Sequence, residues 1–287
     1  MKSPGSDTRL QAAAIADRFV QARLKAAAMR DFPGSLPSNL DGAYAIQAAA
    51  ISRWPDTVAG WKVAMLGPRW KDRLGEERLV GPVFRAGVRT ATGSRVVEFP
   101  VFENGFAAVE AEFIFRLGAD APATKTHWQI GEAAELVHSL HVGVETAGSP
   151  LSIINDLGPL AIVSDFGNNW GIIVGPLVSA WRARPLQSIP SETFIEGVSV
   201  GRGSTASVPG DPLAALAFAL NRCARLGHPL KSGDLISTGA TTGVHPIREG
   251  QNARLSFGEF GEIHCRAARA TPTDGQVRPD QKAGHSC

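Results

Sequence analysis

Two glutamates stand two residues apart in the segment VEAEFIFRL, residues 109–117. If this segment is a β-strand, Glu110 and Glu112 share one face, while the apolar residues between and around them face the other side. Cα atoms two apart on a strand lie roughly 6.5–7 Å from each other, so the two carboxylates repel each other unless water or a cation screens them. A solvated outer face and a cation site would each explain the pair.

A third carboxylate, Glu145, occurs further along the chain in HVGVET, residues 141–146. On a strand, Glu145 shares a face with His141 and Gly143, and the valines of the segment point the other way. Three carboxylates form a set of hard oxygen ligands, which suits Mg²⁺ or Mn²⁺ better than zinc. We therefore expect a metal site if the fold brings Glu145 to the first two glutamates.

Lys62 is the next candidate, in the segment GWKVAML, residues 60–66. Its neighbours on the same strand face are small, Gly60 and Ala64, whereas Trp61 and Val63 face the opposite side. A lysine in such a strand can reach solvent at a sheet edge. Alternatively, a partly desolvated amine that points into a pocket can hold a carboxylate or exchange a proton.

Two polar segments could line a binding pocket. STGATTG, residues 237–243, ends an expected strand with hydroxyl and glycine residues, which form either an ordinary turn or a set of N–H and hydroxyl donors for an anion. SDFGNNWG, residues 164–171, is either a turn or a polar pocket wall that includes Asn168 and Asn169. The candidate residues in these two segments are Ser164, Asp165, Thr238, Gly239, Thr241 and Thr242.

The composition indicates a globular protein. The chain has 287 residues, of which 44% are hydrophobic and 20% charged, and its net charge is +2. Because no basic stripe with interleaved aromatic residues is present, we expect no nucleic-acid partner. No apolar run approaches the roughly 20 residues that cross a bilayer, and the N-terminus lacks the continuous apolar core of a signal peptide. Cys223, Cys265 and Cys287 are too scattered for a disulfide scaffold, so we expect reduced thiols in a cytoplasmic protein with no membrane contact.

Helical patterns open the chain. Apolar residues recur at near-helical spacing from Ile15 to Leu24, and a second helix follows with Ser38 or Asn39 as its cap and Pro55 as its end. We expect two more helices, one over about 131–140 and one from Asp211 to Gly227. Residues 1–57 thus form an N-terminal helical region.

Residues 58–270 have a different texture, with short apolar or alternating runs between glycines and prolines, which indicate β-strands in a mixed or antiparallel sheet system. The expected strands are GWKVAML, RVVEFPVF, VEAEFIFRL, HVGVET, LAIVSDFG, WGIIVGP, FIEGVSV, DLISTG and the segment ARLSFGEFGEIHC. The fold class is therefore α+β. Residues 271–287 are polar and without period, which predicts a disordered tail.

The order of several motifs resembles one known family. LDGAYAIQ, GWKVAMLGP, VEAEFIFRL, GVETAG, SDFGNNWG and GHPLKSGDLISTGATTG follow one another as in the 2-keto-4-pentenoate hydratase branch of the fumarylacetoacetate hydrolase superfamily. Each motif alone is unspecific, but their joint order over about residues 10–268 is specific. The resemblance implies a mixed β-roll or sandwich core behind the N-terminal helical region, and it implies a homo-oligomer.

The resemblance also implies roles for individual residues. Glu110, Glu112 and Glu145 match the metal-binding carboxylates of the family, and Lys62 matches its active-site lysine. Asp165 and the segment from Thr238 to Gly243 fall where relatives line the substrate pocket. One feature departs from the family pattern. An acidic residue often follows the lysine strand in a context like PDFG, whereas this chain reads LGEERLVGPVF, so Glu76 and Glu77 are candidates for acid–base catalysis without a clean match.

The expected activity is a metal-dependent hydration of a 2-hydroxy-2,4-dienoate, or the corresponding 2-keto acid, to a 4-hydroxy-2-keto acid. Mg²⁺ or Mn²⁺ would stabilise the charge of the enolate. Decarboxylation of a 2-keto diacid of the 4-oxalocrotonate type would use the same metal and needs no water. Hydrolysis of an acylpyruvate C–C bond is a further alternative, although residues 67–84 contain no histidine to activate a water molecule. A non-catalytic ligand-binding protein on the same scaffold is the remaining alternative.

Overall fold

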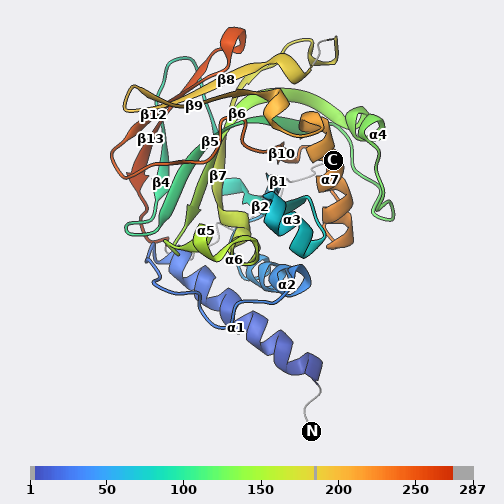
Figure 1. The fold of residues 1–287 in the computed structure, drawn as a ribbon, viewed down its shortest axis with the longest axis vertical. Coiled ribbons are helices and arrows are strands. Elements are labelled where there is room, and N and C mark those ends of the chain that lie inside the picture. Colours follow the sequence, from blue (N-terminus) through green and yellow to red (C-terminus); the bar gives the residue numbers. More distant parts are fainter. Residues whose placement is uncertain (1–3, 184–185, 274–287) are drawn as a thin grey trace, which may run out of the picture.

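The structure is a computed structural model that describes residues 4–183 and 186–273. Two helices open the chain, α1 (Pro4–Leu24) and α2 (Leu40–Ile51), and they lie together at one end of the molecule in Figure 1. The Asn39 side chain, one of the two caps that the sequence predicts, caps α2 by accepting a hydrogen bond from the Gly42 N–H at 2.9 Å. The residues of the expected tail beyond Thr273 lie outside the described residues.

Two mixed sheets follow, which together with the helices make an α+β fold. The larger sheet has the order β2-β1-β10-β5-β6-β7-β3, and β11 pairs with β5. Its strands are β1 (Val58–Met65), β2 (Arg78–Phe84), β3 (Val88–Thr90), β5 (Phe106–Leu117), β6 (Val137–Ser149), β7 (Asn169–Leu177), β10 (Leu235–Ser237) and β11 (His245–Pro246). The smaller sheet has the order β4-β13-β12-β8-β9, with strands β4 (Val97–Val101), β8 (Pro190–Ile195), β9 (Val198–Ser204), β12 (Asn252–Ser256) and β13 (Glu262–Arg269).

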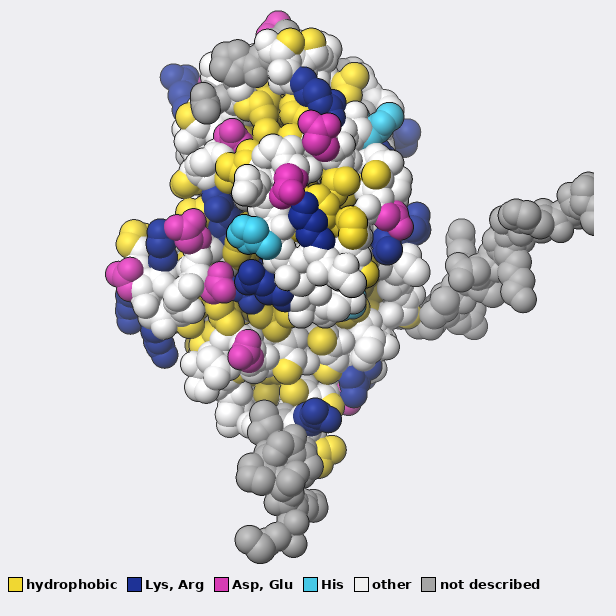
Figure 2. Space-filling view, turned by 90° about the vertical axis from the view of Figure 1, so that its right-hand side faces the viewer, with side chains coloured by type: hydrophobic (Ala, Val, Ile, Leu, Met, Phe, Trp, Pro, Cys, Tyr) yellow, Lys and Arg dark blue, Asp and Glu magenta, His cyan; other side chains and the backbone are white. Residues whose placement is uncertain are grey.

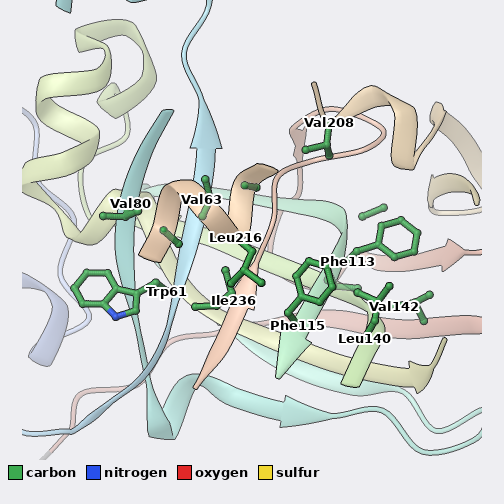
Figure 3. Packing of buried hydrophobic residues seen from close by; sticks show 14 of the residues in the cluster. Trp61, Val63, Val80, Phe113, Phe115, Leu140, Val142, Val208, Leu216 and Ile236 are labelled. Carbon is green, nitrogen blue, oxygen red and sulfur yellow. The ribbon is translucent and has the colours of Figure 1, made fainter. Parts of the chain in front are cut away.

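Helix α7 (Asp211–Arg225) covers the outer face of β1, β2 and β10. Figure 3 shows Leu216 of this helix among Trp61, Val63 and Ile236. The same buried cluster continues to β5 and β6, where Phe113 and its neighbours meet the smaller sheet. These contacts hold one face of the larger sheet rigidly, so the side chains on its other face have fixed positions.

A second buried cluster joins the N-terminal helices to the rest of the chain. Phe19 of α1 and Ile46 of α2 pack with Leu151, Ala161 and Phe166. These last residues belong to the region of the short helices α5 (Ile154–Leu157), α6 (Pro159–Ser164) and the 3₁₀ turn η2 (Phe166–Asn168). The N-terminal helices therefore rest directly on the segment that leads into β7.

Three expected elements are wrong. FIEGVSV is not one strand, because the chain turns at Glu196 and Gly197 between β8 and β9, which pair as a hairpin. LAIVSDFG is not a strand, because Gly158 and Pro159 start helix α6 and Asp165 leads into η2. A short buried apolar run does not distinguish a strand from a helix, and here the turn residues before it decide. The helix expected over 131–140 is only α4 (Ile130–Glu135), because the chain from Val137 onward pairs with β5 as strand β6.

The surface carries charges of both signs. Helix α3 (Pro68–Leu74), with the sequence PRWKDRL, carries charged residues of both signs. On the side of the molecule shown in Figure 2, basic and acidic side chains are interspersed with apolar ones. An ion pair at the surface joins Lys125 and Glu132, 2.6 Å apart. Among the described residues, none of the helices combines the length and the apolar character that a membrane span requires.

Candidate metal centre

Three carboxylates meet on the inner face of the larger sheet. Glu110 and Glu112 both lie on β5, and the register of the antiparallel neighbour β6 sets Glu145 directly opposite Glu110. Gly143 lies opposite Glu112, and the Ile114 side chain fills the space that a side chain at Gly143 would need. One oxygen of each carboxylate lies within 4.8 Å of the others. The strand register thus creates the trio that the sequence analysis expects.

The trio is buried rather than solvated. Glu112 and Glu145 have 0% exposure and Glu110 has 7%, which excludes the outer-face interpretation of the glutamate pair. Glu112 Oε2 accepts hydrogen bonds from the Ser237 hydroxyl and from the Gly239 N–H, the latter at 3.0 Å. Glu145 Oε1 accepts one from Asn169 Nδ2 at 3.0 Å. These donors orient both carboxylates.

Two carboxylate oxygens remain without a partner. Glu112 Oε1 and Glu145 Oε2 are buried, and no group of the described residues donates a hydrogen bond to either. A buried unpaired acceptor costs free energy, so such atoms in a native structure call for a missing partner. Hard oxygen donors clustered in this way are what Mg²⁺, Mn²⁺ and Ca²⁺ bind, and the arrangement fits a divalent cation.

Burial favours the protonated forms of two of the carboxylates, Glu110 and Glu112. Burial, and then the negative charge of Glu145, raises the pKa of Glu110 to about 8. Burial likewise raises the pKa of Glu112 well above its usual range, with further contributions from Glu145 and Glu110. A divalent cation would replace these protons and favour the ionised carboxylates.

Lys62 contacts the trio from β1. Its Nζ lies 3.2 Å from Glu145 Oε1, and the residue is 4% exposed. Burial alone would lower the pKa of this amine, but the charges of Glu145, Glu110 and Glu112 together raise it. The lysine points into the site rather than to solvent, so it remains an ammonium ion beside the carboxylates.

Tight backbone packing covers the stem of Lys62. The residue opposite it on β2 is Gly81, and a Cβ atom there would lie 2.3 Å from the Phe166 carbonyl oxygen. Gly167 has a φ of +70°, which favours glycine. A Cβ atom at Gly167 would lie 3.4 Å from Lys62 Cδ. The SDFGNNWG segment is therefore the wall against which the lysine lies.

Asp165 is engaged away from the trio. Its Oδ1 lies 2.6 Å from Arg23 Nε, in an ion pair whose two side chains are fully buried, and its Oδ2 accepts a hydrogen bond from Ser149 at 2.5 Å. The neighbouring Ser164 donates to the Leu160 carbonyl at 2.7 Å within α6. Both residues anchor the segment next to the site, and their roles in catalysis or substrate binding stay predictions.

The segment from Thr238 to Thr242 packs along β5. Thr238 Oγ1 donates to the Phe113 carbonyl and Thr241 Oγ1 to the Ala111 carbonyl, each at 2.8 Å. Thr242 Oγ1 shares a hydrogen bond with Thr193 at 2.8 Å. Gly239 is the member of this set that contacts the trio, through its N–H to Glu112.

Glu76 and Glu77 lie before β2, and each is paired with a cation. Glu76 forms an ion pair and a hydrogen bond with Arg222 of α7. Glu77 lies 2.5 Å from Lys71 of α3, whose hydrogen bond lowers the pKa of the Glu77 carboxyl. The structure brings neither glutamate into contact with the metal trio through a hydrogen bond or ion pair among the described residues.

Three residues that hold the site have no predicted role at the metal centre, although Asn169 belongs to a possible pocket wall. Ser237 and Asn169 bind Glu112 and Glu145 directly, and Arg23 holds the turn before Asn169. Ser237 and Asn169 stand in the two polar segments already singled out, so strand alternation through DLISTG could have found Ser237. No sequence signal marks Arg23, which lies among the polar residues of an ordinary helix.

Comparisons with known proteins support the α+β fold. The chain is 27% identical over 229 residues to the 2-keto-4-pentenoate hydratase of Paraburkholderia xenovorans, covering 78% of this chain and 82% of that protein. A match of the same extent is found with 2-keto-4-pentenoate hydratase 3 of Pseudomonas putida. These similarities support the resemblance to the hydratase-like branch of the fumarylacetoacetate hydrolase superfamily.

Solved structures agree with this fold. The structure of 4-oxalocrotonate decarboxylase from Pseudomonas putida, complexed with magnesium and adipate, matches with a TM-score of 0.76 at 21% identity, over 90% of this chain and 98% of that one. Fumarylpyruvate hydrolase from Pseudomonas aeruginosa, in complex with Mn²⁺ and pyruvate, matches with a TM-score of 0.53 at 17% identity, over 73% and 89% of the two chains. A scan against models of protein families gives no match.

Proposed function

We propose that this protein is a metal-dependent hydratase that adds water to a 2-hydroxy-2,4-dienoate of the 2-keto-4-pentenoate type and forms a 4-hydroxy-2-keto acid. One observation carries the proposal. Three buried carboxylates converge beside a buried lysine, and two of their oxygens lack a partner. The 27% identity to a 2-keto-4-pentenoate hydratase supports the choice of reaction.

Glu110, Glu112 and Glu145 would hold the ion, for which we propose Mg²⁺ or Mn²⁺ because all the donors are hard oxygens. When bound, the ion supplies a positive charge for the carboxylate and the C2 oxygen of the substrate, and so stabilises the enolate. Ser237, Gly239 and Asn169 keep the carboxylates in place by their hydrogen bonds. Fixed carboxylates need no reorganisation during the reaction.

Lys62 has the position and the charge to bind the anionic substrate. Its ammonium group lies 3.2 Å from Glu145, and the surrounding carboxylates keep it protonated. A protonated amine can donate a hydrogen bond to the substrate carboxylate and can pass a proton to a substrate carbon as the enol becomes the ketone. We therefore assign to Lys62 the roles of anchor and proton donor. Ser164, Thr238, Gly239, Thr241 and Thr242 stay proposed substrate-binding residues.

Water addition also needs a base. Asp165, Glu76 and Glu77 are the proposed candidates, and each would have to act while paired with a cation, respectively Arg23, Arg222 and Lys71. This pairing favours a second candidate function, the decarboxylation of a 2-keto diacid, because that reaction uses the enolate-stabilising charge and requires no base for water. Hydrolysis of an acylpyruvate and a purely ligand-binding role are the remaining alternatives.

One assay separates these functions. The protein is incubated with Mg²⁺ and, in separate reactions, with a 2-hydroxy-2,4-dienoate, a 2-keto diacid and an acylpyruvate. The masses of the products are then measured by mass spectrometry. The proposal predicts a gain of one water molecule by the dienoate, absent in Glu112→Gln. Loss of CO₂ from the diacid without hydration of the dienoate would contradict the hydratase function and indicate a decarboxylase. Scission of the acylpyruvate alone would indicate a hydrolase, and no product from any of them would contradict catalysis on these substrates.

Three further proposals concern the protein as a whole. We propose a β-roll type core, a homo-oligomer and a cytoplasmic location. Sedimentation velocity of the purified protein tests the oligomer, and a single monomeric species would contradict it.

A further inference from the structure

We infer that Arg23, in the N-terminal helix α1, is a positioning residue for the carboxylate trio. It would act by fixing the backbone at Asn169, whose side chain holds Glu145. The inference rests on the proposed function in so far as it assumes that the trio binds a divalent ion.

Arg23 uses all three guanidinium nitrogens. Nε donates to Asp165 Oδ1 at 2.6 Å, Nη1 donates to the Asn169 carbonyl at 3.1 Å, and Nη2 donates to the carbonyls of Gly148 at 2.9 Å and Asp165 at 3.3 Å. The residue is 1% exposed. Such a buried cation is stable only with this full set of acceptors, so the helix and the three acceptor residues are fixed relative to one another.

Aromatic rings surround the same guanidinium. Its Cζ lies 5.0 Å from the ring centroid of Trp170, 5.1 Å from that of Phe166 and 5.8 Å from that of Phe102. A planar, delocalised cation suits both the ring faces and the divergent carbonyls, whereas a lysine ammonium is a single point charge. The position is therefore specific for arginine.

The hydrogen bonds of Arg23 span an unfavourable turn. Phe166, Gly167 and Asn168 all have positive φ, of 53°, 70° and 59°. The left-handed conformation is costly for residues with a Cβ, so the turn persists only if its surroundings hold it. Arg23 binds Asp165 before the turn and Asn169 after it. This clamp decides where the Asn169 side chain is presented.

Asn169 carries the effect to the trio. Its Nδ2 donates to Glu145 Oε1 at 3.0 Å, the same oxygen that Lys62 contacts. The other end of the clamp, Gly148, lies on β6, the strand that carries Glu145. Groups that orient metal ligands in this way commonly change metal affinity by about 10–100-fold when removed. The N-terminal helix would thus set the geometry of a site on a sheet that it does not belong to.

The test is a double-mutant cycle on Mg²⁺ affinity, measured by calorimetry with Arg23→Lys, Asn169→Ala and the double variant. Arg23→Lys is expected to weaken Mg²⁺ binding by about tenfold. Because Arg23 acts through Asn169, Arg23→Lys should add little in the Asn169→Ala background. Equal Mg²⁺ affinity of Arg23→Lys and wild type, or full additivity of the two effects, would overturn the inference.

Two further variants keep the result interpretable. Phe19→Leu removes core packing from the same helix without touching the guanidinium, so it should lower stability to urea and leave Mg²⁺ affinity unchanged. If Arg23→Lys does not fold, Asp165→Asn loosens the same clamp more mildly and should still weaken Mg²⁺ binding, and an unchanged affinity would count against the inference. Absence of Mg²⁺ binding by the wild type would refute the proposed function instead.

Discussion

Glu145 Oε1 has two partners, the ammonium group of Lys62 and the amide of Asn169. The lysine therefore has two opposing effects. Its charge partly neutralises the trio, and it competes with a metal ion for the same carboxylate. A purely structural lysine would influence metal binding but would not take part in the reaction. Substitution of Lys62 therefore separates its effect on Mg²⁺ affinity from its effect on turnover.

The substitution Lys62→Met keeps the apolar stem and removes the charge. Because the competing cation is lost, we expect Mg²⁺ affinity to be retained or increased. Because the proposed anchor and proton donor is lost, turnover should fall by about 10²–10⁴-fold. Calorimetry and the product assay measure the two quantities. Weaker Mg²⁺ binding, or turnover within a factor of a few of the wild type, would contradict the assignment of Lys62.

The raised pKa of Glu110 predicts how stability depends on pH. The folded, metal-free protein keeps a proton on Glu110 up to about pH 8, whereas the unfolded chain releases it near 4.5. The folded state therefore binds more protons in this window, so the metal-free protein loses stability as the pH rises toward 8.

Metal binding has the opposite dependence. Since the ion displaces the proton, the stabilisation by Mg²⁺ should grow with pH, by at most about tenfold in affinity per pH unit for each proton released. Melting temperatures with and without Mg²⁺ at about pH 6 and about pH 8 test this window. A stabilisation independent of pH would mean that the trio is already ionised without metal.

At the level of single residues, the sequence predicts the candidate metal ligands but not the residues that orient them. Glu110, Glu112, Glu145 and Lys62 were predicted because charge on an otherwise apolar strand is unusual. Asn169 is predicted only as part of a turn or a polar pocket wall, and Arg23 has no predicted role, since polar residues in a loop and on a helix are ordinary. Their partners are set only when α1, β6 and the turn before β7 come together.

At the level of elements, strand β2 packs on the turn η2 through backbone atoms. Gly81→Ala would put a Cβ 2.3 Å from the Phe166 carbonyl and 2.7 Å from Gly167 Cα, and neither atom can move easily. We expect a loss of about 1–3 kcal/mol in the free energy of unfolding. Mg²⁺ affinity should fall as well, because the displaced turn leads to Asn169. Urea denaturation and calorimetry give the two values.

Gly131→Ala is the matched control for this prediction. Gly131 lies in α4 with open space where the Cβ would be, so alanine should leave stability unchanged or raise it by about 0.5–1 kcal/mol. Equal effects of the two substitutions would show that the close contact between β2 and η2 is not important for stability.

Pattern alone located most strands but not every boundary. VEAEFIFRL and GWKVAML became β5 and β1 because alternation is a direct consequence of strand geometry. LAIVSDFG is buried on all sides and has no alternation to identify it, so its helix was missed. The helix expected to reach residue 140 ends at Glu135, because pairing with β5 from Val137 outweighs local helix propensity.

For the whole molecule, the trio depends on one long-range fact, the register of β6 on β5. A shift by one residue would turn Glu145 to the opposite face of the sheet. The sequence gives the face of each strand but not its partner, so only the resemblance to known relatives linked Glu145 to the pair before the fold was known. The structure supplies that link through the pairing of Glu110 with Glu145.

The most direct test of the account is a calorimetric titration of Mg²⁺ into the metal-free protein, compared with Glu112→Gln and with Glu135→Gln, an exposed glutamate of α4. The account predicts one Mg²⁺ per chain for the wild type and for Glu135→Gln. For Glu112→Gln it predicts affinity reduced by about 100-fold or more. Equal Mg²⁺ binding by all three proteins, or none by the wild type, would contradict the claim that the buried glutamates form a metal site.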